Sequence, residues 1–376
     1  MLNWQIELDK LFSYSSPKIN PFRSTDDAGI VLYGAGAMGE MALDLLETIS
    51  IRPEYFVDKN LQGDIRGIAI ISPENISPDD LKAKIFIICI VTVPIDPIVD
   101  YLHSLGCRDV RHFYDYSEIA LKDKISNGWA LFSPSNQDKQ AIANVLKKLE
   151  HDSYSIAHYL QFLWWRLRRK EHIYQGYSVL SAKKYFKAPC IPKLQENEIF
   201  LDAGAHFGTT IEKFIETTHG YFGSIWAYEP DQYNFERLKK ALINNRYSHK
   251  IYVYTYALSN KSTMKKFINK LGFASHIDEN GECEVPSYTI DSLHLTPTII
   301  KLHLEGHELK ALEGAKDTIS KSRPIIMALA DHNEDGLYKI ANFLTHLDSY
   351  TLYFYLHDYC GNSAIFYAIP NERHEV

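Results

Sequence analysis

The chain has 376 residues, of which 45% are hydrophobic and 23% charged, and its formal net charge is −7 at pH 7. This balance is typical of a globular protein and excludes a disordered or collagen-like chain. At roughly 100–200 residues per domain, the length predicts two domains, or one large α/β unit with an insertion. The negative charge argues against a field for nucleic acid, so no nucleic-acid partner is expected.

Cysteine usage and hydropathy indicate a compartment. The 5 cysteines are widely spaced and no C-x-x-C occurs, which argues against a disulfide framework or a zinc ribbon. The first ten residues lack the charged-then-apolar layout of a signal peptide. The longest apolar run, 85–94, is far shorter than the roughly 20 residues of a spanning helix. We therefore expect a cytoplasmic protein without a transmembrane segment.

A glycine turn opens the first half of the chain. A short apolar run at 29–32 leads into the sequence GAGAMG at 34–39, and a helical stretch follows at 40–48. Such glycines allow the backbone to approach a phosphate closely at a helix N-terminus. A second strand at 54–57 ends in Asp58, where an acid can hold a ribose hydroxyl. The residues predicted for a second nucleotide site are therefore Gly34, Gly36, Gly39 and Asp58.

Alternating strands and helices continue to about residue 116. Further strands are predicted at 67–71, 84–90 and 109–113, with a helix at 94–105, which gives five short strands in an open parallel sheet. This segment, about 27–116, resembles the small Rossmann-like domains that precede sugar-modifying transferases. The resemblance implies a nucleotide, a nucleotide-sugar or a purely structural role, and the turn alone does not separate NAD from a nucleotide-sugar.

The middle of the chain reads as a linker followed by helix. Residues 126–136 are rich in Gly, Ser, Pro and Asn, and 138–174 carries apolar residues at helical spacing. The basic-aromatic run at 164–170 has two interpretations. It is either a patch for an anionic glycan, lipid headgroup or nucleic acid, or an amphipathic helix with a solvated basic face and its tryptophans packed between domains. We favour the second.

The second half repeats the strand–turn–helix pattern in another form. A strand at 198–201 runs into D-x-G-x-x-x-G at 202–208, followed by a helix to about Thr217. The next strand, 224–228, ends in Glu229, whose carboxylate can accept both ribose hydroxyls of an adenosyl group. The methionine end of S-adenosylmethionine carries an amino and a carboxyl group, and Asp202 can meet the ammonium or position the turn. The pattern therefore favours S-adenosylmethionine over NAD.

Short blocks follow the turn in a fixed order. With 200–205 and Gly208, they are YEP at 228–230, ALSN at 257–260, TIDSL at 289–293, IKLHLEGHE at 300–308, LEGA at 312–315 and RP at 323–324. Over about residues 180–370 this combination resembles the FkbM family of S-adenosylmethionine-dependent methyltransferases. The resemblance implies S-adenosylmethionine as cofactor and O-methylation of sugars, polysaccharides or natural products. The predicted cofactor-binding residues are Asp202, Gly204, Ala205, His206, Gly208, Glu229 and Asn260.

One position departs from the family's pattern, because His303 stands where the family usually has Asp. His303 follows the predicted fourth strand of the second sheet, at the edge where α/β folds place catalytic groups. Histidine can act as a base, but it suits Mg²⁺ poorly because that ion prefers oxygen ligands, so no metal is predicted. Glu305 matches the family, and His332 follows strand five at the same edge. The predicted catalytic residues are His303, Glu305 and His332.

The predicted fold class is α/β, with two Rossmann-like parallel-sheet domains and a helical connector. The C-terminal domain is predicted to have a class I methyltransferase fold that ends in an antiparallel hairpin. The predicted boundaries are a helical lead at 1–26, a small Rossmann-like domain at 27–120, the connector at 121–189 and the methyltransferase domain at 190–376.

The predicted function is S-adenosylmethionine-dependent O-methylation of a sugar hydroxyl on a glycan, a polysaccharide or a nucleotide-linked sugar. The alternative is an NAD-dependent oxidoreductase or a nucleotide-sugar-binding protein that uses the first glycine turn, with a decayed methyltransferase domain. The expected partner is a small-molecule or glycan substrate, and a homo-oligomer stays open. The sequence does not determine the acceptor, the methylated position or the ligand of the first domain.

Overall fold

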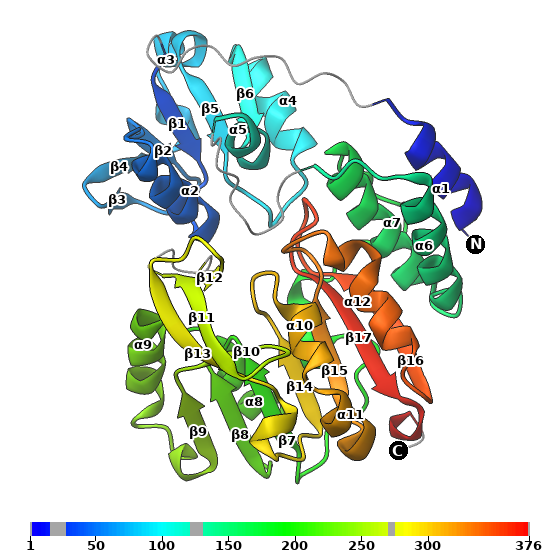
Figure 1. The fold of residues 1–376 in the computed structure, drawn as a ribbon. Helices are drawn as coiled ribbons and strands as arrows, with labels where there is room; N and C mark the ends of the chain where they lie inside the picture. Colours follow the sequence, from blue (N-terminus) through cyan, green and yellow to red (C-terminus); the bar gives the residue numbers. More distant parts are fainter. Residues whose placement is uncertain (1, 16–27, 121–130, 270–274, 375–376) are drawn as a thin grey trace.

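The computed structural model describes residues 2–15, 28–120, 131–269 and 275–374. The predicted boundary between 26 and 27 lies outside these ranges, as do residues 121–130, where the predicted connector begins. The described residues form a small α/β body, a larger α/β body and a group of helices beside the larger sheet (Figure 1). The predicted class, α/β with two largely parallel sheets, is confirmed.

The small sheet has six strands in the order β3-β4-β2-β1-β5-β6. They are β1 (Ile30–Tyr33), β2 (Tyr55–Val57), β3 (Gly63–Ile65), β4 (Ile68–Ile71), β5 (Ile85–Ile88) and β6 (Asp109–His112). Its helices are α2 (Ala37–Thr48), α3 (Pro78–Ala83), α4 (Asp96–Ser104) and α5 (Phe113–Ala120). The prediction of five parallel strands missed β3, which pairs antiparallel with β4. β3 is short and largely exposed, so it has no apolar run to reveal it.

The large sheet has seven strands in the order β16-β17-β15-β14-β7-β8-β9. They are β7 (Ile199–Ala203), β8 (Ser224–Tyr228), β9 (Ile251–Tyr254), β14 (Ile299–Leu302), β15 (Ile325–Leu329), β16 (Tyr350–Leu356) and β17 (Ala364–Pro370). The surrounding helices are α8 (Thr209–Thr217), α9 (Gln232–Leu242), α10 (Glu308–Glu313), α11 (Lys316–Ser322) and α12 (Asp335–Thr345). β17 runs antiparallel to β15 and to β16, so the predicted terminal hairpin is confirmed.

A third, four-stranded sheet was not predicted. It consists of β10 (Ala257–Leu258), β11 (Thr263–Ile268), β12 (His276–Ile277) and β13 (Cys283–Tyr288), in the order β10-β13-β11-β12. Lysine and glutamate occupy several positions of β11 and β13, and little of either strand is buried. The apolar alternation that would predict a strand is therefore weak.

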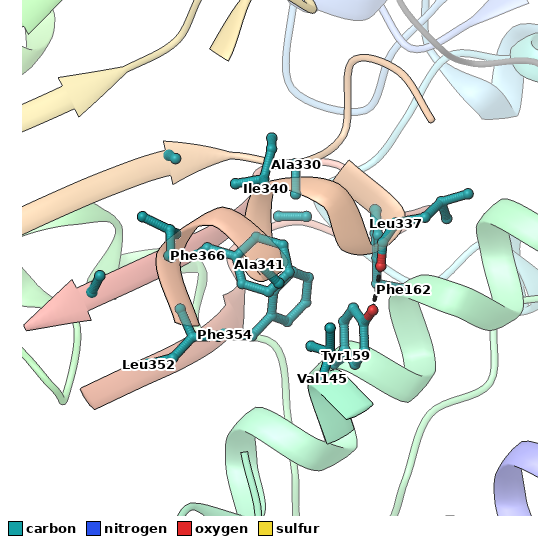
Figure 2. Packing of buried hydrophobic residues seen from close by; sticks show 14 of the residues in the cluster. Val145, Tyr159, Phe162, Ala330, Leu337, Ile340, Ala341, Leu352, Phe354 and Phe366 are labelled. Atoms are coloured by element: carbon teal, nitrogen blue, oxygen red, sulfur yellow. Dashed lines mark hydrogen bonds between the residues drawn. The ribbon is translucent and has the colours of Figure 1, made fainter. Parts of the chain in front are cut away.

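The middle helices belong to the core of the larger body. The predicted stretch 138–174 is two helices, α6 (Asn136–Lys148) and α7 (Ser153–Arg168), and Asp152 caps the second. Tyr159 and Phe162 of α7 pack against Phe354 and Phe366 of the hairpin, and the Tyr159 hydroxyl donates a hydrogen bond to the Leu337 carbonyl (Figure 2). Helix α1 (Trp4–Ser13) packs on α6 and α7. The helices predicted as a connector thus form a layer over the hairpin.

The basic-aromatic run is mostly buried. Trp164, Trp165 and Arg166 are buried, and Arg166 donates a 2.7 Å hydrogen bond to the Asp331 carbonyl. Arg169 pairs with Asp115 at 3.2 Å and with Glu118 at 2.6 Å. The interpretation of this run as a binding patch is therefore wrong. The expected solvated basic face is also wrong at Arg166 and Arg169, because both side chains have partners inside the protein.

The two bodies meet at the loop that joins β16 to β17. Trp165 packs edge-on against His112 of the small body, as expected for a tryptophan between domains. The amide of Tyr359 in the loop donates a 2.7 Å hydrogen bond to the Val91 carbonyl. The Tyr114 hydroxyl of the small body donates one of 2.5 Å to Asn362 Oδ1 in the same loop. These contacts hold the small sheet near the edge of the large sheet where the loop emerges.

Within the described parts of the chain, none of the helices combines the length and the apolar character that a membrane crossing requires.

Candidate active site

The carboxyl ends of β7, β8, β14 and β15 meet at one edge of the large sheet, where α/β folds place their ligands. The turn after β7 passes directly against the end of β14. Gly204 has φ +76°, and a Cβ there would lie 1.9 Å from the His303 carbonyl oxygen. Only glycine satisfies both the backbone conformation and the close approach.

Glu229, directly after β8, is 5% exposed and bonds the turn that follows β7. Its Oε2 accepts a 2.8 Å hydrogen bond from the His206 amide, and its Oε1 accepts one of 3.1 Å from the Asp231 amide. Burial raises the pKa of Glu229 to about 7, although these hydrogen bonds oppose the shift. The carboxyl group is therefore close to its midpoint at neutral pH and gains from further donors.

Asp202, which lies beneath the turn, helps to hold the turn in its conformation. It is fully buried, and Lys301 Nζ donates to its Oδ1 at 2.8 Å and to the Gly204 carbonyl at 2.6 Å. Burial raises the pKa of Asp202 and the Lys301 ammonium opposes that rise. Asp202 thus holds the turn through Lys301, a residue that the sequence analysis did not select although it lies in a quoted block.

A first cavity opens above this turn. Its lining includes four predicted cofactor residues, Gly204, Ala205, His206 and Glu229. Gly208 has φ +88° at the start of α8 and is not among the lining residues. Asn260 lies outside the lining as well, and its amide donates to Glu313 at 2.7 Å.

The three predicted catalytic residues come together beside that cavity. Glu305 Oε1 lies 3.1 Å from His303 Nε2 and 3.3 Å from His332 Nε2. The two imidazole rings stack with centroids 4.9 Å apart. Burial and the neighbouring His332 lower the pKa of His303 well below its usual range. Burial also lowers the pKa of His332, but Glu305, Glu308 and Asp331 outweigh it and raise the pKa to about 10.

Two further residues orient these rings. The Tyr185 hydroxyl lies 3.3 Å from His303 Nδ1, and Glu308 Oε1 lies 2.7 Å from His332 Nδ1. Glu308 also accepts hydrogen bonds from the Leu304 and Gly306 amides. Glu308 could have been selected because it lies in a quoted block, whereas no pattern in the sequence singles out Tyr185.

A second cavity lies between the two bodies. It is lined by Met38 and Met41 of α2 and Val91 from the small body, and by Leu329, Asp331 and His332 from the large one. Lys184, His303 and Glu305 line both cavities. Lys184, which the sequence analysis missed, donates a 2.8 Å hydrogen bond to Ser363, and burial lowers its pKa.

Close packing requires glycine at two positions of the first glycine turn. A Cβ on Gly34 would lie 2.7 Å from the Cys89 carbonyl oxygen, and one on Gly39 would lie 2.1 Å from that of Gly34. Around Gly36, nothing among the described residues lies within 4 Å of such a Cβ. Asp58 accepts hydrogen bonds from the amides of Ala35, Asn60 and Leu61. Its carboxylate thus closes the turn, and a nucleotide at this site stays a prediction.

The order of the large sheet, its antiparallel hairpin and the glycine turn with its acid define the class I methyltransferase fold. Residues 202–361 match the family model described as the methyltransferase FkbM domain. This stretch of the chain is therefore an FkbM methyltransferase domain, as the sequence motifs predict.

One solved structure supports the fold over almost the whole chain. The methyltransferase FkbM from Methylobacillus flagellatus KT aligns over 97% of this chain and 98% of its own, with TM-score 0.67 and 18% identity. At this identity the likeness shows the fold alone. A fibrillarin/Nop5p complex aligns over 54% of this chain and 88% of that chain at 14% identity and TM-score 0.33, too low to carry an argument. No curated protein matches the chain.

Membership of a methyltransferase family implies S-adenosylmethionine as methyl donor. The first cavity fits this group in its chemistry. It offers a buried carboxylate for hydroxyl donors and a turn whose Gly204 leaves no room for a side chain. None of the comparisons points to NAD or another nucleotide in the small sheet.

Proposed function

We propose that the protein transfers a methyl group from S-adenosylmethionine to a sugar hydroxyl of a glycan, a polysaccharide or a nucleotide-linked sugar. The observation that carries this proposal is the shared wall of the two cavities. Lys184, His303 and Glu305 face both, so a donor in one cavity and an acceptor in the other would meet at these side chains.

The first cavity is assigned to the cofactor, which supplies a methyl group already activated on a sulfonium. Glu229 would accept the ribose hydroxyls, as acids at the end of the second strand do in related folds. The backbone of Gly204 to His206 would lie along the methionine end. Asp202 would keep the turn in place through Lys301, which bonds the Gly204 carbonyl and also lines the cavity.

The second cavity is assigned to the acceptor. Its lining combines Asp331, Asp358 and Asn362 with the apolar side chains of Met38, Met41 and Leu329. Polar groups suit the hydroxyls of a sugar and apolar groups suit its C–H faces, so the mixture supports a carbohydrate over a purely apolar acceptor. The contribution of α2 gives the small body a role in holding the acceptor.

The shared residues would prepare the hydroxyl for transfer. A sugar hydroxyl is a poor nucleophile, so its proton must leave as the new bond forms. Both histidines direct Nε2 to Glu305, which supports a joint role in holding the acceptor oxygen. The proton would pass to Lys184, which lines both cavities and whose lowered pKa, caused by burial, favours release of its own proton to solvent beforehand. The oxygen–carbon bond forms while the carbon–sulfur bond breaks, leaving S-adenosylhomocysteine.

The test is transfer of an isotope-labelled methyl group to a panel of sugar nucleotides, oligosaccharides and amine controls, with release of S-adenosylhomocysteine as readout. We expect methylation of a hydroxyl. His303→Ala should lower turnover about 100-fold while cofactor affinity changes less than threefold, because His303 lies where the two cavities meet and the substitution leaves Glu229 and the glycine turn in place. Transfer to nitrogen alone, or unchanged turnover of His303→Ala, would contradict the proposal.

A further inference from the structure

We propose that His303, Glu305 and His332 form a binding site for a divalent first-row transition-metal ion at the wall between the two cavities. The donor atoms of these three residues all lie within 4.8 Å of one another. They come from the ends of two neighbouring parallel strands, β14 and β15, so the sheet itself sets their spacing. The sequence analysis predicted no metal, because it considered Mg²⁺ at His303 and that ion prefers oxygen ligands.

The ligand atoms face one point. Both Nε2 atoms approach the same oxygen, Glu305 Oε1, at 3.1 and 3.3 Å. Atoms that share a metal at bond lengths of about 2.0–2.2 Å are separated by about this distance. Glu305 itself has φ +48°, a conformation that non-glycine residues rarely adopt, and its carboxylate is 12% exposed.

The outer nitrogen of each ring is already engaged. His332 Nδ1 lies 2.7 Å from the Glu308 carboxylate and His303 Nδ1 lies 3.3 Å from the Tyr185 hydroxyl. A carboxylate on the far side of a ligating histidine fixes its tautomer and strengthens the nitrogen that binds the metal. In the tautomer that carries its proton on Nδ1 and donates it to Glu308, the Nε2 lone pair of His332 faces Glu305 Oε1, and a cation can bind between these two acceptors.

A fourth donor atom and the local charge point the same way. Asp331 is 9% exposed, and its Oδ1 has no hydrogen-bond partner among the described residues, although it lies only 3.9 Å from His332 Nε2. Glu305, Glu308 and Asp331 bring three carboxylates around one imidazole. Buried carboxylates in such a group need positive charge nearby, and a divalent ion supplies more than one protonated histidine does.

The donor set selects the class of metal. Two imidazoles with one carboxylate suit Zn²⁺, Mn²⁺, Co²⁺ or Fe²⁺, whereas Mg²⁺ prefers oxygen ligands alone. Since His303 and Glu305 line both cavities, an open coordination position would face the acceptor. A hydroxyl that coordinates there has a lowered pKa. This chemical role rests on the proposed O-methylation, whereas metal binding itself does not.

The test uses the full-length protein, stripped with a chelator and titrated with Co²⁺ and Zn²⁺ in the absence of cofactor and acceptor. We expect one ion per chain by calorimetry, with the visible absorption of a nitrogen-ligated Co²⁺. Glu305→Gln and His303→Gln should each weaken binding at least 100-fold. Glu308→Gln should weaken it about 10–100-fold, because Glu308 acts through His332. His346→Gln, at an exposed histidine outside the cluster, is the matched control.

Circular dichroism and thermal melting would verify that each variant is folded. The variant His303→Asp provides a second test of metal binding. By replacing a nitrogen with an oxygen donor, it should weaken Zn²⁺ and strengthen Mg²⁺ binding. The proposal is overturned if the wild-type protein binds no stoichiometric Co²⁺ or Zn²⁺, or if binding survives both Glu305→Gln and His303→Gln. Metal binding without any hydroxyl methylation would instead count against the proposed function alone.

Discussion

The two glycine turns of this protein share one local design and differ in what surrounds them. In each, an acid from the second strand of the sheet accepts a hydrogen bond from a turn amide: Ala35 to Asp58 at 3.0 Å, and His206 to Glu229 at 2.8 Å. Burial opposes ionisation at Asp58, but three backbone amides outweigh it and lower its pKa. At Glu229 burial dominates and raises the pKa to about 7. The same motif can therefore close a turn or offer a carboxylate to a cavity.

Substitutions of glycine should reveal the largest difference between the two turns. Gly204→Ala should abolish measurable cofactor binding and lower the free energy of unfolding by about 2–4 kcal/mol, because the new Cβ would meet the His303 carbonyl at a positive φ. Gly36→Ala, in the first turn, should change stability by less than about 1 kcal/mol and leave cofactor binding intact. Denaturant unfolding and calorimetry with S-adenosylhomocysteine measure both. Equal effects of the two substitutions would break the comparison.

Substitutions of the two acids, Glu229 and Asp58, should give the next largest difference. Glu229→Ala should weaken S-adenosylhomocysteine binding about 100-fold, since two charge-assisted hydrogen bonds to the ribose would be lost. Asp58→Ala should leave that affinity unchanged and cost about 1–2 kcal/mol of stability, because it leaves turn amides without their acceptor. Normal affinity in Glu229→Ala would reject the ribose assignment.

A smaller effect is expected on the pH dependence of cofactor binding. With a pKa of about 7, Glu229 is increasingly protonated below neutral pH, and the protonated form is a poorer acceptor for hydroxyls. Affinity should therefore be about tenfold weaker at pH 6 than at pH 8. The free protein has the opposite sign: a carboxyl whose folded pKa is raised loses stability as the pH rises through 7. Calorimetry at several pH values tests this, and Glu229→Gln should give a flat profile.

Much of the fold could be predicted because its strands are locally encoded. β8 was predicted at its observed bounds and β5 within two residues at each end, since each is an apolar run next to turn residues. The third sheet could not be predicted, because β11 and β13 are paired to each other and bury little. Helix α7 was predicted as a helix, but its burial depends on the hairpin that it covers.

The candidate site divides in the same way. Motif order placed His303, Glu305 and His332 at strand ends, where the structure has them. Lys184 and Tyr185 could not be found, because they precede the first quoted block, at 200–205, and reach the site only through folding.

The sequence by itself determined the two glycine turns, the acids that follow them and the order of strands that identifies a methyltransferase. These features depend on spacing between near neighbours, which the chain encodes directly. Only the tertiary structure decided which acid lines a cavity, which acid has a raised pKa and which histidines share one carboxylate. Those properties depend on burial and on contacts between segments far apart in the chain, and spacing along the sequence does not set either.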